Sequence, residues 1–191
     1  MQRKEKLQSF DSQSITDPKE FLQSNYDYYA CRQIPSAPEL DLLKWVINLP
    51  GEVGFVYHKQ KWILIKGSED GVPVRLLPTD WDIFIHSHPI IPCDDKEEGC
   101  IPSLNDLINA SKNAKNIIIS EKGITQYYPP KNADRDQMII AFFDWIDLEI
   151  NIDASKKQQE YLNFLAEIDA GFVTYPWEEI NDEKLSELLS L

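Results

Sequence analysis

The sequence has few cysteines. Three occur in 191 residues, at positions 31, 93 and 100. A small, odd number of cysteines is not typical of the disulfide frameworks of secreted domains. The first ten residues, MQRKEKLQSF, also lack the apolar stretch of a secretory signal peptide. We therefore expect a soluble, intracellular protein and predict a cytoplasmic location.

The chain also lacks an excess of basic residues. Its 19 Lys and Arg are outnumbered by 32 Asp and Glu, which gives a formal net charge of -13. Proteins that bind nucleic acid or anionic membranes concentrate Lys and Arg on their surface. Long apolar runs are missing too, since the strongest one, residues 138–143, ends at Asp144 and is too short to span a bilayer. The sequence predicts no nucleic-acid partner and no membrane partner, and it leaves the oligomeric state open.

The composition is that of a folded chain. Hydrophobic residues make up 42% and aromatic residues 11% of the sequence, enough for a sizeable core. We divide the chain into a polar N-terminal segment (1–35), an α/β core (36–131) and a mainly helical C-terminal extension (132–191). The predicted fold class is α/β (α+β), with a mixed β-sheet flanked by helices.

The local patterns behind this division are clear in the core. A helix is predicted over SAPELDLLKWVINLPG, with Ser36 as its cap. Strands are predicted in EVGFVYHKQ, KWILIKG, VPVRLLP and WDIFIHSHP, a helix in PSLNDLINASKN, and a closing strand pair in NIIISEKG and ITQYYPP. In the extension, KKQQEYLNFLAEI and NDEKLSELLSL are predicted helices, the latter capped by Asn181, whereas DQMIIAFFDWIDLEI fits a helix or a strand.

Two histidines mark a candidate metal site at the end of the fourth predicted strand. Side chains alternate along a strand, so His86 and His88 point to the same face. Asp106, in the helix that follows, can add a carboxylate oxygen. Two imidazoles and one carboxylate leave a fourth tetrahedral position open, which is typical of catalytic Zn²⁺. Water bound there becomes acidic and needs a base, and Glu52 at the start of the first core strand is the candidate.

Each part of this pattern has a simpler interpretation. Ser103-x-x-Asp106 before an apolar run is also a capping box, in which Asp106 bonds back to the Ser103 backbone. His-x-His alone is a weak signal, and Glu52 alone is an ordinary strand carboxylate. Only the combination, in this order and on these elements, favours a metal site.

The pattern Glu52 … His86-Ser-His88-Pro … Ser103-x-x-Asp106 resembles the JAMM motif of the Jab/MPN metalloprotease family. The order of predicted elements over residues 39–130 is also similar to that family. The resemblance implies that Zn²⁺ is bound by His86, His88 and Asp106. It also implies that Glu52 is the general acid/base and that Ser103 helps to stabilise the oxyanion.

The function implied by this resemblance is hydrolysis of isopeptide or peptide bonds at the C-terminus of ubiquitin or a ubiquitin-like protein. The substrates would be conjugates of these proteins. The alternative is a non-catalytic MPN-type scaffold or interaction module, which keeps the fold but holds no metal.

The sequence departs from the family pattern between the second histidine and the serine. Fourteen residues, 89–102, intervene, and the family usually has a shorter spacer. Insertions in loops cost little closure entropy, so the ligands can still meet. Within the insertion, CDDKEEGC, the cysteines Cys93 and Cys100 fit a disulfide, a second metal site or two ordinary thiols. Its acidic residues fit either a basic partner surface or simple solvation.

Overall fold

The computed structural model describes residues 14–24, 30–69, 71–73, 80–89, 98–130, 135–149, 152–153 and 156–190. The helices are α2 (Pro18–Gln23), α3 (Leu40–Val46), α4 (Leu104–Asn109), α5 (Arg135–Glu149), α6 (Lys157–Glu167) and α7 (Asp182–Leu189), with short 3-10 turns η2 (Glu98–Cys100) and η4 (Trp177–Glu179). The strands are β1 (Cys31–Ile34), β2 (Val53–His58), β3 (Lys61–Lys66), β4 (Ile83–Ser87), β5 (Lys115–Ser120), β6 (Gly123–Tyr128) and β7 (Gly171–Pro176). None of the described helices is long and apolar enough to cross a membrane.

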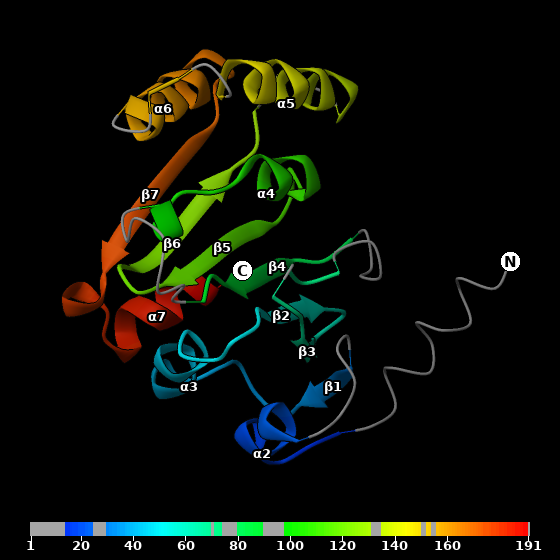
Figure 1. Ribbon diagram of the computed structural model, residues 1–191. Helices are drawn as coiled ribbons and strands as arrows, with labels where there is room; N and C mark the ends of the chain where they lie inside the picture. Colours follow the sequence, from blue (N-terminus) through cyan, green and yellow to red (C-terminus); the bar gives the residue numbers. More distant parts are fainter. Residues whose placement is uncertain are drawn as a thin grey trace, which may run out of the picture.

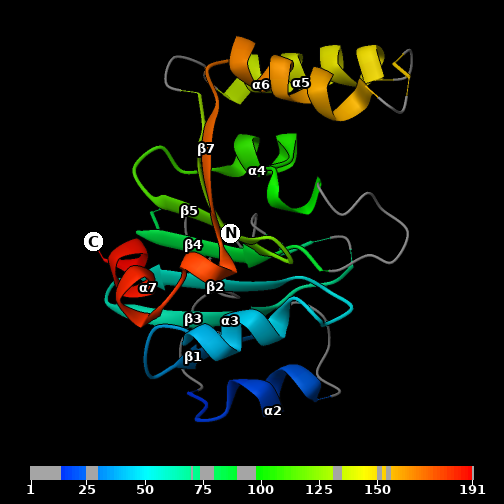
Figure 2. The same ribbon diagram turned by 90° about the vertical axis from the view of Figure 1, so that its left-hand side faces the viewer.

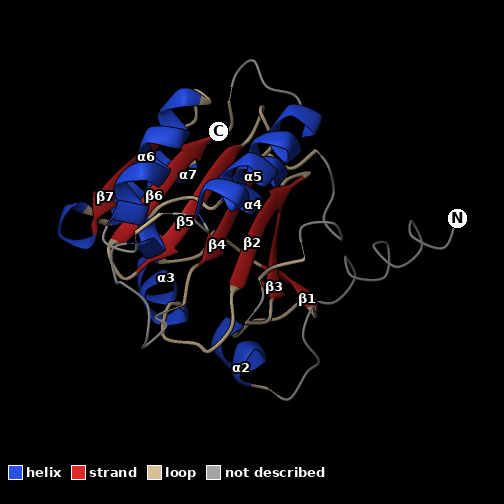
Figure 3. Ribbon diagram, turned by 45° about the horizontal axis from the view of Figure 1, so that its top comes forward, coloured by secondary structure: helices blue, strands red, loops and turns tan. Residues whose placement is uncertain are grey.

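The strands form one mixed sheet in the order β1-β3-β2-β4-β5-β6-β7. Strands β4 and β5 pair in parallel, and the other described neighbours pair antiparallel. Helices lie on both sides of this sheet (Figures 1 and 3). The predicted class, a mixed sheet flanked by helices, is confirmed at this level.

The parallel pairing of β4 and β5 influences the position of α4. Parallel neighbours need a crossover connection, and α4 lies within the one that joins β4 to β5. The chain leaves β4 at its carboxyl end, so the first turn of α4 lies near that end of the sheet. Residues that follow β4 and residues that open α4 are therefore brought together.

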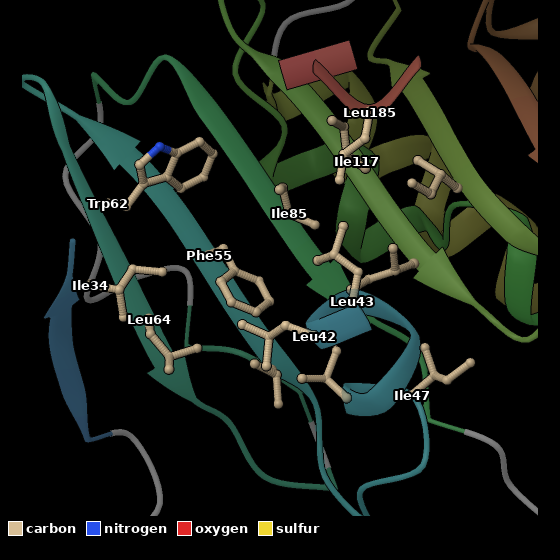
Figure 4. Close-up of a cluster of buried hydrophobic side chains, with 14 of the residues drawn as sticks. Ile34, Leu42, Leu43, Ile47, Phe55, Trp62, Leu64, Ile85, Ile117 and Leu185 are labelled. Atoms are coloured by element: carbon tan, nitrogen blue, oxygen red, sulfur yellow. The ribbon is translucent and has the colours of Figure 1, made fainter. Parts of the chain in front are cut away.

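The larger core covers the sheet face that carries Phe55, Ile85 and Ile117. Helices α2, α3 and α7 close this face, with buried residues such as Leu43 and Leu185 packed against the strands (Figures 2 and 4). This burial removes large apolar side chains from water, which is the main favourable contribution to folding.

The opposite face carries a second cluster and the candidate site. Ile118 and Tyr127 of the sheet pack there with Leu107 of α4, and Met138, Trp145 and Leu165 come from α5 and α6. Figure 3 shows these three helices together on one side of the sheet. The C-terminal helices therefore share a core with α4.

The C-terminal region also contains a strand that the sequence analysis did not predict. β7 pairs with β6 along its length, and α7 contributes Leu185 and Leu188 to the larger core. Residues after 132 are thus mainly helical but complete both the sheet and the core. The pattern GFVTYP is a weak strand signal, because it is short and follows a segment with helical spacing.

Other local predictions were partly right. The ambiguous segment DQMIIAFFDWIDLEI is helical. Asn181 caps α7, because its side-chain oxygen accepts a 2.8 Å hydrogen bond from the Lys184 amide. Ser36 is not a cap, because the helix begins at Leu40 with Glu39 in the cap position and no side-chain bond. Strand β1, inside the segment described as polar, was not predicted. Most of the predicted strand VPVRLLP lies outside the described residues.

Gly123 is required where the turn after β5 meets β7. Its φ of 143° is a conformation that other residues rarely adopt, and a Cβ there would overlap the Tyr175 carbonyl. We expect Gly123→Ala to lower the free energy of unfolding by about 1–3 kcal/mol, because backbone must shift to make room. Urea denaturation measures this. The control is Gly171→Ala, whose Cβ would make an ordinary 3.9 Å contact with Tyr128. Equal stability of the two variants would contradict the prediction.

Candidate metal centre

The two histidines lie at the carboxyl end of β4 and share a face of the sheet. His86 is buried within the strand, and His88 follows it and remains partly exposed. Their Nε2 atoms are 3.1 Å apart. The alternation predicted from His-x-His is confirmed, and both rings are directed at one point.

Each imidazole is held in its orientation by the surrounding structure. The His88 Nδ1 lies 2.9 Å from the carbonyl oxygen of Gly99, so it donates there and leaves Nε2 for the site. His86 stacks on Phe84, with ring centroids 5.2 Å apart, and meets Tyr127 edge-on. Its Nδ1 is buried and has no hydrogen-bond partner in the described part of the chain.

Asp106 takes part in the helix cap and in the site at the same time. Its Oδ2 accepts a 2.7 Å bond from the Ser103 amide, and the Ser103 Oγ accepts from the Asp106 amide at 3.1 Å, which is a complete capping box. Its Oδ1 lies 3.0 Å from the His86 Nε2. The two interpretations of Ser-x-x-Asp are therefore compatible, because the carboxylate has two oxygens.

The separations between the three donors fit a metal ion. Tetrahedral Zn²⁺ with bonds of about 2.0–2.1 Å places its ligand atoms about 3.3 Å apart. The two histidine Nε2 atoms are 3.1 Å apart. The His86 Nε2 lies 3.0 Å from the Asp106 Oδ1, and the His88 Nε2 lies 3.6 Å from the Asp106 Oδ2. His86, His88 and Asp106 thus form a cluster that can hold a metal ion.

Glu52 approaches the same site from β2. Gly54 pairs with His86 in the antiparallel register, so continuing that register places Glu52 opposite His88 and on the same face. Its Oε2 accepts a 3.0 Å bond from the Val72 amide, which fixes the carboxylate. It is not one of the clustered donors.

The charges of the site influence one another. Burial raises the pKa of Glu52 above its usual value, although both imidazoles oppose this. Burial would also raise the pKa of Asp106, but His86 and His88 outweigh it and hold the pKa well below the usual range. Burial disfavours the charged form of His88, yet the nearby Asp106 carboxylate outweighs this and raises the pKa of the imidazole. The centre therefore has one firmly ionised carboxylate and one that protonates more readily.

Ser103 is tied to Asp106 through its side chain. Its hydroxyl donates a 2.7 Å bond to the Asp106 Oδ2 while accepting the Asp106 amide. The resemblance to the JAMM motif implies that Ser103 stabilises an oxyanion. In this structure the hydroxyl proton is already used within the cap.

Four neighbours of the site were not found from the sequence: Gly99, Val72, Tyr127 and Tyr161. The first two act through backbone groups, for which a sequence carries no signal. The tyrosines come from β6 and α6, far along the chain. The acidic part of the insertion with Cys93, residues 90–97, lies outside the described residues.

Comparisons with known proteins add no relative. No family model matches the chain, and neither the curated proteins nor the solved structures include a significant match.

Proposed function

We propose that the protein is a zinc-dependent hydrolase that cleaves an isopeptide or peptide bond at the C-terminus of ubiquitin or a ubiquitin-like protein. The observation that carries the proposal is the close approach of two imidazole nitrogens and the Asp106 carboxylate, at separations that fit a shared metal ion. The supporting observation is a second carboxylate, Glu52, held on the same face. A cytoplasmic location is part of this proposal.

The ligand residues are His86, His88 and Asp106. Zn²⁺ held there would polarise the scissile carbonyl and make a bound water more acidic. His88 presents Nε2 because its Nδ1 bonds to Gly99, and Asp106 remains anionic because the imidazoles lower its pKa. In the proposal these three residues bind the metal ion and fix its position.

Glu52 moves the proton. Its raised pKa suits a group that takes a proton from the attacking water and then delivers it to the leaving amine. For an isopeptide that amine is the ε-amine of a lysine. The bond from Val72 keeps one carboxylate oxygen in place while the other is used.

Ser103 has two roles in the proposal. It holds Asp106 through its amide and hydroxyl, and it stabilises the oxyanion when the hydroxyl exchanges that bond for one to the substrate.

The substrate class comes from the resemblance to the JAMM motif. Three features support the resemblance: Glu52 precedes β2, the histidines lie at the carboxyl end of β4, and Ser103 caps the helix that follows. A mixed sheet with a βαβ crossover at the site is compatible with an MPN-type domain.

The test uses the full chain, supplied with one equivalent of Zn²⁺ after removal of other metals. It is incubated with linear and isopeptide-linked ubiquitin and ubiquitin-like fusions, and products are identified by mass spectrometry. We expect cleavage after the terminal glycine of at least one fusion, abolished by 1,10-phenanthroline and restored by Zn²⁺. A chain that binds no Zn²⁺ would support the scaffold alternative. Zinc binding without cleavage of any fusion would contradict the substrate class.

A further inference from the structure

One short segment contacts two of the three candidate ligands. At its start, the carbonyl of Gly99 accepts the bond from the His88 Nδ1 at 2.9 Å. At its end, the amide and hydroxyl of Ser103 both donate to the Asp106 Oδ2 at 2.7 Å. The position of residues 99–103 therefore sets the orientation of His88 and Asp106 together.

The segment is itself held by the C-terminal part of the chain. The hydroxyl of Tyr161, on α6, donates a 2.7 Å bond to the carbonyl of Pro102, which immediately precedes Ser103. Because the two partners are 59 positions apart in the sequence, this bond depends on how α6 packs with α4 and α5.

The ring of Tyr161 is well fixed. It packs against Trp145 of α5 and Phe164 of its own helix, with ring centroids 5.0 and 6.4 Å away. Burial raises its pKa, and the negative charge of Asp106 raises it further, so the hydroxyl keeps its proton and remains a donor. Packing of the ring fixes the position of the hydroxyl, and the hydroxyl holds residues 99–103 through its bond to Pro102.

We infer that Tyr161 is a positioning residue for the metal centre, through which the C-terminal helices set metal affinity. The inference rests on the metal site of the proposed function, but not on its substrate. Groups that orient metal ligands without touching the metal typically change affinity about 10–100-fold when lost. Tyr161 acts one step further out, so we expect an effect near the lower end.

The experiment compares wild type, Tyr161→Phe and the control Tyr128→Phe. Tyr161→Phe removes one hydroxyl and leaves the ring packing. Tyr128 is exposed on β6, so Tyr128→Phe controls for the loss of a tyrosine hydroxyl in general. Zinc affinity is measured by competition with a chromogenic chelator. Amide hydrogen exchange at Ser103 is measured by NMR in the metal-free protein, and urea unfolding of the same samples gives the global stability.

We expect Tyr161→Phe to weaken zinc binding about 10-fold and to speed exchange at Ser103 relative to global unfolding, while Tyr128→Phe does neither. Unchanged affinity with unchanged exchange would overturn the inference. A variant that loses only global stability and keeps wild-type affinity would overturn it too.

The proposed function is tested separately in this design. If the wild type holds no zinc, the proposed function and the effect of Tyr161 on metal affinity both fail, whereas exchange at Ser103 still shows whether Tyr161 holds the segment. If zinc binds but no fusion is cleaved, the affinity comparison is unaffected.

Discussion

Glu52→Gln is expected to lower the turnover of any fusion that the wild type cleaves by about 10²–10⁴-fold, the range that general acid–base catalysis contributes. Glutamine keeps the size of the side chain and can still accept the Val72 amide, but it cannot take a proton from water. Zinc content should remain that of the wild type, because Glu52 is outside the cluster of donors. Substrate binding should persist.

Turnover is measured at saturating substrate. Zinc content is determined by metal analysis of the same samples. The matched control is Glu69→Gln, an exposed position two residues before Gly71. Full activity of Glu52→Gln would show that another group moves the proton. Loss of zinc instead of turnover would make Glu52 a ligand or a structural residue.

Asp106→Asn is expected to lose zinc while keeping the helix cap. The amide oxygen of asparagine can still accept from the Ser103 amide, but it is neutral and a poor partner for two imidazoles. Because a ligand itself is lost, the affinity should fall by more than the roughly 10–100-fold typical of groups behind the ligands. Asp106→Ala should lose zinc and also the cap, which is worth about 0.5–2 kcal/mol for capping interactions.

The pair of variants separates the two roles of the residue. Zinc affinity by chelator competition reports the ligand, and urea unfolding in the metal-free protein reports the cap. Asp182→Asn, in the exposed first turn of α7, is the control for a helix-start substitution. If Asp106→Ala binds zinc as tightly as the wild type, Asp106 acts only in the helix cap and is not a ligand.

The cluster of three candidate ligands could be predicted from the sequence because each residue has a local signature. His86 and His88 have the period of a strand, and Ser103-x-x-Asp106 begins a helix after a strand, so the distance along the chain limits where they can lie. The cap and the ligand were predicted as competing interpretations, whereas the structure allows both, because the Oδ2 bonds to the Ser103 amide while the Oδ1 lies 3.0 Å from the His86 Nε2. Only the positions of the two carboxylate oxygens show whether Asp106 can take part in the cap and the site at the same time.

The two edges of the sheet were harder to predict from the sequence than its centre. β1 and β7 are the outer strands of the sheet, and each pairs with a neighbour on one side. Their short patterns are weak, because an outer strand is specified by the partner already in place more than by its own sequence. α5 could not be assigned from its continuous apolar run, and packing against α4 and α6 decided it.

The sequence by itself determined the mixed α/β class and the three residues that can share a metal, because strand period and helix capping are local properties. Tertiary structure decided what holds those residues. The βαβ crossover places Asp106 beside the histidines, the antiparallel register places Glu52 opposite His88, and α6 brings Tyr161 to Pro102. These contacts join residues far apart in the chain through backbone carbonyls and amides, which every residue carries and no sequence pattern marks.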